Sequence, residues 1–510
     1  MASASENKER SLEDVAAEVE KLRKAGKTIV HCHGVFDLLH IGHIKHLRAA
    51  KKHGDVLVVT ITQDRYVNKG PHRPAFGERH RSEALASIEC VDLVAINAWP
   101  TAVETIRLLK PDVFVKGSVK EKGPRDHSNA ITEEEEAVKS VGGRLAMTYE
   151  ETFSASSLIN QYVDVYTPEV KAFLEDFRKH HKPEGITGQL DKIRGLKVLA
   201  IGETIVDEYE FCRVMDKANK DPILAAEHLY EERYGGGVLA IANHIASFCD
   251  EVGVLSFLGD RNSHAEFVRA KLKPSVKPHF FTKSESPTIV KRRFLEEYLA
   301  VKIFELYEIN GEPLAGADEA RFCGLLEELL PKYDVVVVAD YGHGLFTPKS
   351  ISLLCKEAKF LAVNAQVNAG NRGFNFVSKY PRADYISIDE PEARLETRNQ
   401  KIGIKDLIKM ITDRVSCPRM MLTVGKKGSV CFEAGSGFVT IPSFGVRLVD
   451  RIGAGDAVLG VTAPCVAAGI PMEEVGFIGN VVGAEACGIM GNKSSIDRAS
   501  IFRHITSLMK

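Results

Sequence analysis

Apolar and polar residues alternate along the chain with two different periods, which mark strands and helices. Short runs rich in valine, isoleucine and leucine are separated by stretches in which apolar residues recur every three or four positions. In the first part of the chain the runs predict strands at 28–33, 56–61, 93–96 and 113–116, and the stretches predict helices at 41–53, 81–89 and 102–109. Regular alternation of strand and helix predicts right-handed βαβ units and a parallel sheet.

This alternation stops and then restarts, which divides the chain. Residues 167–194 are highly charged, include the run Lys179–Pro183 and show little strand signal beside a helix at 170–180. The basic run is more typical of a solvated helix end than of an anion site. Strands are predicted again at 197–202, 252–257, 335–340, 360–364, 385–388, 420–424 and 430–432. We therefore expect an N-terminal extension or helix at 1–25, a small α/β domain at 26–166, a linker at 167–194 and a larger α/β domain at 195–510.

The amino-acid composition limits the classes of molecule that the chain can bind and the cellular compartment in which we expect it. A chain of 510 residues with a formal charge of −2 has no global field that would attract nucleic acid or anionic lipid, so phosphate binding must be local. No apolar run approaches the roughly 20 residues that a membrane span needs, and residues 1–10 lack the apolar core of a signal peptide. The ten cysteines are scattered without a Cys-x-x-Cys pair, which indicates reduced thiols. We expect a cytoplasmic protein.

The loop at residues 33–43 is the strongest chemical signal. It follows a predicted strand and leads into a predicted helix, a place where open α/β sheets bind phosphates through free N–H groups and the helix dipole. Gly42 permits close approach of the backbone to a phosphate. His40 and His43 lie three residues apart, on the same side of the first helical turn. Two imidazoles there can stabilise charge on a nucleotide α-phosphate, which indicates nucleotidyl transfer by positioning and electrostatics.

Three charged residues downstream fit the same site. Asp64 ends the next strand, Lys69 lies in a basic loop that could close over a triphosphate, and Arg81 opens the following helix. Each of these residues alone is more typical of a solvated surface charge. Because all three follow the histidine loop in this order along the chain, we interpret them as parts of the same nucleotide site.

With these motifs the first domain resembles the cytidylyltransferase-like nucleotidyltransferases. The resemblance lies in Phe-Asp-Leu-Leu-His-Ile-Gly-His at 36–43, Lys69-Gly70, Arg73-Pro74, the pattern that starts at Arg81, and Ser154–Ser156. It is most similar to the adenylyltransferase half of the bacterial bifunctional heptose kinase/adenylyltransferase family. That resemblance implies a small, doubly wound parallel sheet, catalytic roles for His40, His43, Lys69 and Arg81, and nucleotide contacts from Gly34, Phe36, Asp37, Gly42, Asp64, Ser154 and Ser156.

A second candidate site lies near the C-terminus. Gly453-Ala454-Gly455-Asp456 precedes a run that can form a helix. Backbone N–H groups at such a helix start can hold a transferring phosphoryl group, and Asp456 can accept a hydroxyl proton from a substrate.

Other motifs at predicted strand ends accompany Asp456. In chain order they are Gly202 with Asp207, Gly235–Gly237 followed by Asn243, Asp340–Gly344, Asp389–Glu392 and Thr423-x-Gly425-x-x-Gly428. Together they resemble the ribokinase/PfkB carbohydrate kinases over about 310 residues, and again one half of the heptose enzymes, here in reversed domain order. The resemblance implies an α/β/α domain with a small lid sheet, ATP and Mg²⁺ as reactants, and a homodimer built through the lid strands. It implies Asp456 as catalytic base; Gly453, Ala454, Gly455, Thr423, Gly425 and Gly428 at the nucleotide; Asp207, Gly236, Gly237, Asn243, Lys291, Arg293 and Asp340 at the sugar; and Glu392 at magnesium, through water.

Departures from the heptose-type pattern keep alternatives open. His343 stands in place of lysine, Asp389 in place of asparagine, and 364–366 in place of Asp-Pro-Lys, which suggests a substrate other than heptose 7-phosphate. The leading interpretation is a bifunctional sugar kinase and sugar-phosphate nucleotidyltransferase that makes a nucleotide-activated sugar. One alternative is a nucleotidyltransferase whose kinase-like half only binds or dimerises. Another is a polyol-phosphate cytidylyltransferase with a fused kinase. The residues do not separate ATP from CTP in the first domain.

Overall fold

The computed structural model describes residues 8–67, 74–117, 129–148, 166–218, 220–298, 301–445 and 448–509. The chain forms two compact units, within residues 1–165 and 166–509. Each unit has its own hydrophobic core.

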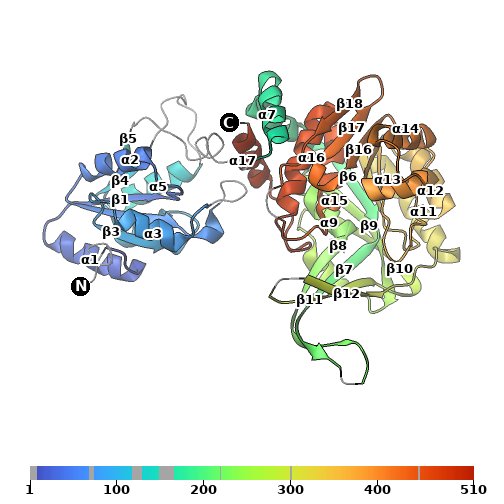
Figure 1. The fold of residues 1–510 in the computed structure, drawn as a ribbon, viewed down its shortest axis with the longest axis horizontal. Coiled ribbons are helices and arrows are strands. Elements are labelled where there is room, and N and C mark those ends of the chain that lie inside the picture. Colours follow the sequence, from blue (N-terminus) through green and yellow to red (C-terminus); the bar gives the residue numbers. More distant parts are fainter. Residues whose placement is uncertain are drawn as a thin grey trace. The chain divides into compact units, whose positions relative to one another are not determined.

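The first unit is a five-stranded parallel sheet between two layers of helices (Figure 1). Its elements are α1 (Leu12–Lys24), β1 (Ile29–Gly34), α2 (Ile41–Lys51), β2 (Val56–Thr62), α3 (Glu78–Ala86), β3 (Leu93–Asn97), α4 (Val103–Leu109), β4 (Val113–Gly117), α5 (Asn129–Ser140) and β5 (Arg144–Thr148). The strand order is β3-β2-β1-β4-β5, with every pair parallel.

Alternating residues of each strand build the two cores of this unit. Val30 on β1 and Leu57 on β2 pack against α2 and α3, whereas their neighbours Ile29 and Val58 pack against α1. This follows from the period of two along a strand. Helix α1, within the stretch expected to be an extension or helix, buries Val15 in the second of these cores.

The strand order reverses next to β1, which pairs with β2 on one side and with β4 on the other. At such a switch point the loops after the two central strands diverge and leave a crevice at the carboxyl end of the sheet. The loop that follows β1 and leads into α2 lies at this crevice.

The second unit contains a nine-stranded sheet and a four-stranded sheet. The large sheet has the order β10-β9-β6-β13-β14-β15-β16-β17-β18, and only its last two pairings are antiparallel. Its strands are β6 (Lys197–Gly202), β9 (Glu251–Arg261), β10 (Val276–Pro287), β13 (Val335–Asp340), β14 (Leu361–Ala365), β15 (Tyr385–Asp389), β16 (Arg419–Thr423), β17 (Ser429–Glu433) and β18 (Gly437–Ile441).

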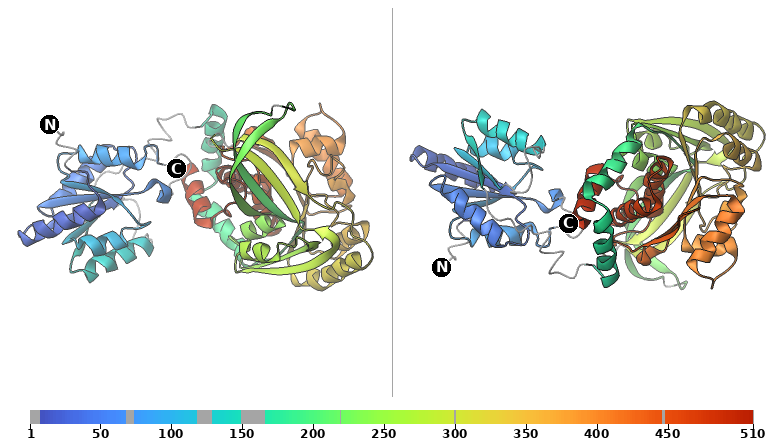
Figure 2. Two further views of the ribbon diagram at one scale, coloured as in Figure 1. Left: turned by 90° about the horizontal axis from the view of Figure 1, so that it is seen from below. Right: turned by 90° about the horizontal axis from the view of Figure 1, so that it is seen from above.

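Helices cover both faces of the large sheet (Figures 1 and 2). One face carries α9 (Val238–Ile245), α15 (Ala454–Ala467) and α16 (Met472–Ala486), and the other carries α11 (Gly316–Leu329), α12 (Pro348–Glu357), α13 (Glu390–Thr397) and α14 (Ile404–Val415). The remaining helices are α7 (Pro168–His180), α8 (Pro183–Lys192), α10 (Ala265–Lys271) and α17 (Arg498–Leu508). In the stretch expected to be a linker, Phe177 of α7 and Leu190 of α8 are part of the buried core of this unit.

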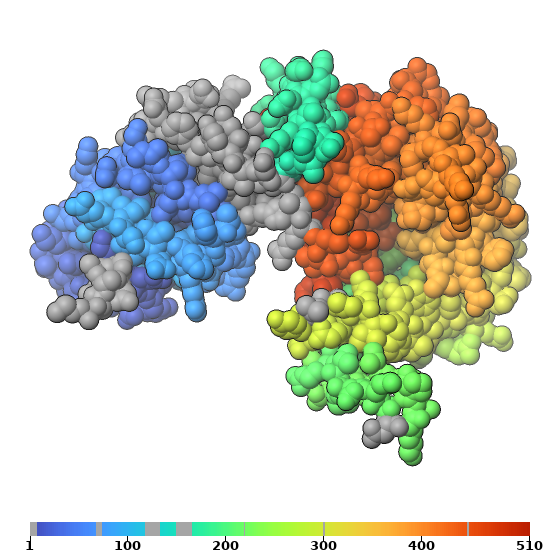
Figure 3. Space-filling view, in the orientation of Figure 1, coloured from blue at the N-terminus to red at the C-terminus, as the bar shows by residue number. Residues whose placement is uncertain are grey.

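The small sheet has the order β12-β11-β7-β8 and is called the lid here. Its strands are β7 (Thr204–Lys217), β8 (Leu224–Gly237), β11 (Ile289–Glu296) and β12 (Val301–Glu308). The space-filling view shows the tip of the β7–β8 hairpin standing clear of the rest of the unit (Figure 3).

The predicted α/β class and both parallel sheets are confirmed. The lid strands β7, β8 and β12 had no strand prediction, and neither did β5, β10 and β18. Charged residues occupy much of the outer parts of β7 and β8 and weaken their apolar signal. Among the described residues no helix is both long and apolar enough to cross a membrane.

Candidate functional site

The loop between β1 and α2 is held in a constrained shape. Phe36 and Leu38 both have φ of 50°, a left-handed conformation that is uncommon for residues other than glycine. The Phe36 ring lies over Gly34, where a Cβ would be only 3.1 Å from it, and meets His43 edge-on at 5.5 Å between ring centroids. Backbone strain of this kind clusters at functional sites.

His40 and His43 lie together at the start of α2. His40 is the N-cap residue, and its Nδ1 accepts the N–H of Gly42 at 3.1 Å. A neutral imidazole that accepts at Nδ1 carries its proton at Nε2, so Nε2 of His40 is a donor. The two rings are 3.9 Å apart and inclined by 31°. The predicted pair is therefore present at a helix N-terminus, where donors and the helix dipole favour a phosphate.

Arg81 and Asp37 bind the protein's own backbone. The Arg81 side chain is 1% exposed, and it donates to the carbonyl oxygens of Val35, Thr62 and Phe76 at 2.5–2.9 Å. These contacts fix the loop after β1 against the end of β2. Asp37 is equally buried and accepts the N–H groups of the segment that leads into α3, beginning with Ala75 at 2.9 Å. Both residues shape the site rather than face it.

Asp64 completes this arrangement. Its carboxylate accepts from Arg81 at 2.6 Å and from the N–H of Glu78 at 3.0 Å, while the Glu78 carboxylate accepts the N–H of Asp64 at 2.8 Å. Lys69, Ser154 and Ser156 lie outside the described residues.

His46 was not among the predicted residues. It lies one helical turn after His43, and its Nδ1 is 2.7 Å from Thr148 Oγ1 at the end of β5. It also lies close to Gly117 at the end of β4. The spacing of three residues from His43 was visible in the sequence, but the pairing with Thr148 depends on the sheet order.

In the second unit, Asp207 on the lid strand β7 is contacted from several segments of the chain. Its carboxylate accepts from Arg293 at 2.5 Å and from the Asn492 amide at 3.1 Å. A Cβ on Gly236 would collide with Asp207, and one on Gly453 would collide with Asn492. Gly236 of β8, Arg293 of β11 and Asn492 thus lie around the Asp207 carboxylate. Asn492 also lies against Gly453, in the turn before α15. Asn492 was not predicted, because no local motif marks it.

Asp456 lies in the first turn of α15, directly after the glycine turn. Tyr341 donates to its Oδ1 at 2.8 Å. Desolvation raises the pKa of Asp456 to about 6, and the charge of Asp207 acts in the same direction, whereas the Tyr341 hydrogen bond opposes them. A carboxyl with its pKa close to neutral can both accept and release a proton, as a general base requires.

Lys291 is a buried cation near this carboxyl. It is 4% exposed, and its ammonium lies over the rings of Tyr307 and Tyr341, at 5.2 and 5.8 Å from their centroids. Burial lowers its pKa, and the charge of Asp207 opposes this. The predicted residues Asp207, Gly236, Lys291, Arg293 and Asp456 are therefore brought together.

Two predicted sugar contacts lie elsewhere. Asn243 caps the end of α10, where its side chain binds the backbone of Lys271 and Lys273 at 2.8 and 2.9 Å. Asp340 is 1% exposed and is bound by Lys379, Tyr380 and the N–H of Gly342. Gly237 has φ of 59° and packs on the Glu203 backbone, which makes it a turn residue.

Glu203 and His343 support the loop after β13. Glu203 is fully buried and accepts the N–H groups of Tyr341 and His343, each at 3.0 Å; burial and the charge of Asp340 raise its pKa to about 7. His343 is 1% exposed, and burial lowers its pKa to about 3, so its imidazole is neutral. The heptose-type lysine is thus replaced by an uncharged group.

The predicted nucleotide segment follows β16. Thr423 ends that strand, Gly425 has φ of 55° with open space around it, and Gly428 has φ of 94° against the backbone of Ile441. Gly428 is therefore required by a close backbone approach, whereas Gly425 faces an open surface.

Glu392 lies in the first turn of α13 and forms a reciprocal cap with Asp389, at 2.8 and 2.9 Å. Burial and the charges of Asp389 and Asp456 raise the pKa of Glu392 to about 8. In the described part of the chain no group of three or more histidine, cysteine or acidic side chains could hold a metal ion. Mutual repulsion of these carboxylates fits a hydrated divalent cation, bound through water, which would relieve it.

These two sites define an α/β protein with a nucleotide-type loop in one unit and, in the other, a buried carboxyl group at a glycine turn beside a small lid sheet. Residues 196–499 match the model of the pfkB family carbohydrate kinases, and residues 31–161 match the cytidylyltransferase-like model. The chain belongs to the pfkB carbohydrate kinase family and carries a cytidylyltransferase-like domain before the kinase domain.

Similar proteins include two-domain relatives. The bifunctional protein HldE of Geobacter metallireducens is 36% identical over 170 residues, which are 33% of each chain. The protein of the same name from Campylobacter jejuni subsp. jejuni serotype O:6 is 28% identical over 317 residues, 61% of this chain and 65% of the relative. Each alignment thus spans between a third and just under two thirds of the relative.

Solved structures also match the second unit. Phosphofructokinase-2 from Escherichia coli, in complex with potassium, aligns with a TM-score of 0.49 and 14% identity over 62% of this chain and 100% of its own. Ribokinase from Thermotoga maritima aligns with a TM-score of 0.48 and 14% identity over 60% of this chain and 98% of its own.

The buried contacts of Arg81 predict a structural role that can be measured. Lysine cannot reproduce a planar fork of donors, so Arg81→Lys should lower the free energy of unfolding of the first unit by about 3 kcal/mol. Trp99, the single tryptophan, lies in that unit and reports its unfolding by fluorescence in urea. The exposed Arg79→Lys on the same helix is the control, with an expected change below about 0.5 kcal/mol. Unchanged stability of Arg81→Lys would instead support direct phosphate binding.

Proposed function

We propose that the chain is a bifunctional enzyme that makes a nucleotide-activated sugar of the heptose-like class or a related one. The second unit phosphorylates a sugar or sugar phosphate with ATP, and the first unit transfers a nucleotidyl group to a sugar phosphate with release of pyrophosphate. The observation that supports this proposal is Asp456, which lies in the first turn of α15 directly after a glycine turn, has a pKa raised to about 6 and accepts a hydrogen bond from Tyr341.

In the proposed kinase reaction the sugar lies between the lid and Asp456. Asp207 and the neighbouring Arg293 orient the sugar hydroxyls, and Asp456 accepts the proton of the attacking hydroxyl. The N–H groups of Gly453, Ala454 and Gly455 stabilise charge on the transferring phosphoryl group. Thr423, Gly425 and Gly428 border the ATP site. Magnesium, bound through water near Glu392, would neutralise phosphate charge.

In the proposed nucleotidyl transfer a sugar phosphate attacks the α-phosphate of ATP or CTP. His40 and His43 donate hydrogen bonds to the α-phosphate oxygens as charge builds up, and Gly42 lets the backbone approach them. Lys69, Ser154 and Ser156 are proposed to bind the remaining phosphates. Arg81, Asp37 and Asp64 act as positioning residues that fix the loop. Gly34 and Phe36 support His43.

We also propose a reducing, cytoplasmic location, which the ten free cysteines support.

A homodimer through the lid is a further part of this proposal. Eight of the fourteen large apolar side chains that are strongly exposed in the described residues lie on the lid strands or their turns: Met215, Ile223, Leu224, Tyr230, Tyr298, Val301, Phe304 and Leu306. Phe304 stacks on Phe294 of β11 at 4.3 Å and remains 54% exposed. Apolar patches of this kind mark interaction surfaces.

The reciprocal variants Asp456→Asn and His43→Asn test the two activities. Asp456→Asn should slow phosphorylation about a thousand-fold, since a general base contributes on the order of 10²–10⁴, and should spare pyrophosphate release. His43→Asn should instead slow pyrophosphate release and leave phosphorylation unchanged. Mass spectrometry of products from a matrix of ATP or CTP with sugars and sugar phosphates measures both. Unchanged phosphorylation in Asp456→Asn would reject the kinase assignment.

The pKa of Asp456 predicts the pH dependence of phosphorylation. The base must be ionised, so kcat/KM should rise about ten-fold per pH unit below pH 6 and level off above it. Tyr341→Phe removes a donor to the carboxylate, which destabilises the charged form and raises the pKa, so the midpoint should move to higher pH. Tyr307→Phe is the control, because Tyr307 donates to Glu305. A midpoint unchanged in Tyr341→Phe would refute this base.

Association through the lid predicts that Leu306→Lys yields monomers in sedimentation velocity, because a charge on the apolar face cannot be buried without a partner. Phe374→Lys, at an apolar residue that is 82% exposed and lies outside the lid, should leave the wild-type assembly. Identical assembly states for wild type and Leu306→Lys would exclude this interface.

A further inference from the structure

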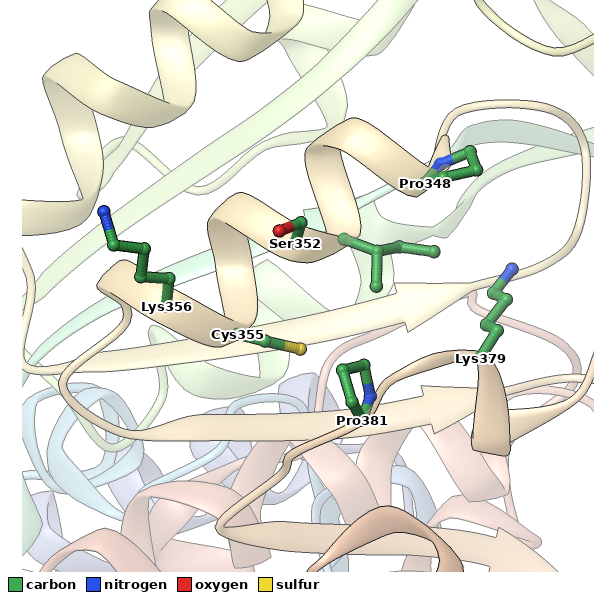
Figure 4. Close-up of a pocket in the computed structure, with 7 residues that line it drawn as sticks. Pro348, Ser352, Cys355, Lys356, Lys379 and Pro381 are labelled. Carbon is green, nitrogen blue, oxygen red and sulfur yellow. The ribbon is translucent and has the colours of Figure 1, made fainter.

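A groove runs along α12 in the second unit and takes no part in the proposed reactions. It has a volume of about 470 Å³ and lies between α12 and the segment 379–381. Figure 4 shows Lys356 and Lys379 at its two ends, with Cys355, Ser352 and Pro381 between them. We call it the α12 groove.

Lys379 holds a buried carboxylate and still has a donor to spare. Its ammonium is 2.5 Å from Asp340 Oδ2 and 2.7 Å from Asn375 Oδ1, and its side chain is 30% exposed. An ammonium has three N–H donors, and no third acceptor within the described residues is bound to it. The remaining donor belongs to a side chain that lines the groove.

The rest of the groove suits an amphipathic anion. Ile351, Pro348 and Pro381 supply an apolar wall. The Lys356 side chain is 79% exposed and forms an ion pair with its neighbour Glu357, a contact of little strength at a surface. Along the helix, Pro348 and Lys356 are about 12 Å apart at 1.5 Å per residue. The groove therefore offers a cation at each end of an apolar surface.

A continuous set of contacts joins Lys379 to the catalytic loop. Asp340, which Lys379 binds through Oδ2, accepts the N–H of Gly342 at 3.0 Å through Oδ1. Gly342 lies between Tyr341, which donates to Asp456, and His343, whose N–H binds Glu203. A displacement of the Lys379 ammonium would thus move Asp340 and the loop 341–343, whose Tyr341 donates a hydrogen bond to Asp456. Two sites in a protein can be coupled energetically through such a network of packed contacts when it has two alternative arrangements.

We propose that the α12 groove is a binding site for a small organic anion with an apolar body. The acidic group of the ligand binds the third donor of Lys379, and the apolar body covers Ile351 and Cys355. The bound acidic group draws the ammonium toward the groove and weakens its contact with Asp340, so occupancy loosens the loop 341–343 and slows the kinase reaction. Binding itself does not depend on the proposed kinase activity.

The probe for this site is 8-anilinonaphthalene-1-sulfonate, and its matched control is N-phenyl-1-naphthylamine, which has the same body without the sulfonate. Cys355 is half-buried in the groove. With the full-length protein, the sulfonate should slow alkylation of Cys355 by iodoacetamide at least five-fold in peptide mass spectrometry, and the neutral control should not. Cys90 and Cys487, also half-buried, are the internal references. An unprotected Cys355 overturns the proposal.

Three variants test the geometry of the site. Ser352→Trp fills the groove without touching Lys379 and should weaken protection at least ten-fold. Lys356→Gln removes one cation and should weaken it about three-fold. Lys349→Gln makes the same change at an exposed lysine of α12 that does not line the groove, and should have no effect. If Ser352→Trp and Lys356→Gln bind the probe like wild type, the dye binds elsewhere and the site is rejected.

Backbone hydrogen exchange tests the coupling. The probe should speed exchange in the peptide that contains residues 341–343 in the wild type, but not in Ser352→Trp. The same response should persist in Asp456→Asn, so that failure of the groove and failure of the kinase assignment are distinguishable. Protection of Cys355 without any change in exchange would reject the coupling.

Discussion

Both units depend on one constraint, a parallel sheet buried by helices on its two faces. Such a sheet has apolar residues on both sides of every strand, so polar groups can reach a ligand only where strands end. In the first unit this places Gly34 and the histidines of α2 beside the switch point between β1 and β4. In the second it brings Asp340, Asp389 and Thr423 to one edge of the sheet, since each ends its strand.

Charged residues at these edges divide into two groups with different physical roles. Arg81, Asp37 and Asp340 are buried and bind backbone groups on several segments, so their charge shapes loops. Asp456 and Lys291 are also desolvated but form no ion pair with any residue that the structure describes, and their pKa values move toward neutrality. Burial without an ion pair is costly and is retained where chemistry uses it. This difference separates the charged residues that fix the loops from Asp456 and Lys291, which are the candidates for chemistry.

Buried polar contacts connect the lid to the segment that precedes α15. Asp207 on β7 and Arg293 on β11 form a buried pair, and Lys302 on β12 binds Asp450 close to the glycine turn before α15. Tyr209 on β7 donates to the same Asp450 at 2.9 Å. Two lid strands, β7 and β12, therefore contact the segment that precedes Asp456, and a lid movement would be transmitted to Asp456 through these contacts.

Several features were determined by the sequence alone, because they depend on local periodicity and local motifs. Most strands of the two large sheets were predicted in this way, though not β5, β10 and β18, and so were the histidine pair at the start of α2 and the glycine turn with Asp456. The partners of each charged residue were decided only by the tertiary structure. Asp207 meets Asn492 across 285 positions of the chain, Arg81 is enclosed by backbone carbonyls, and Asn243 caps a neighbouring helix. The reason is physical: periodicity fixes which residues face a core, whereas a hydrogen bond between distant segments depends on the order in which the strands assemble.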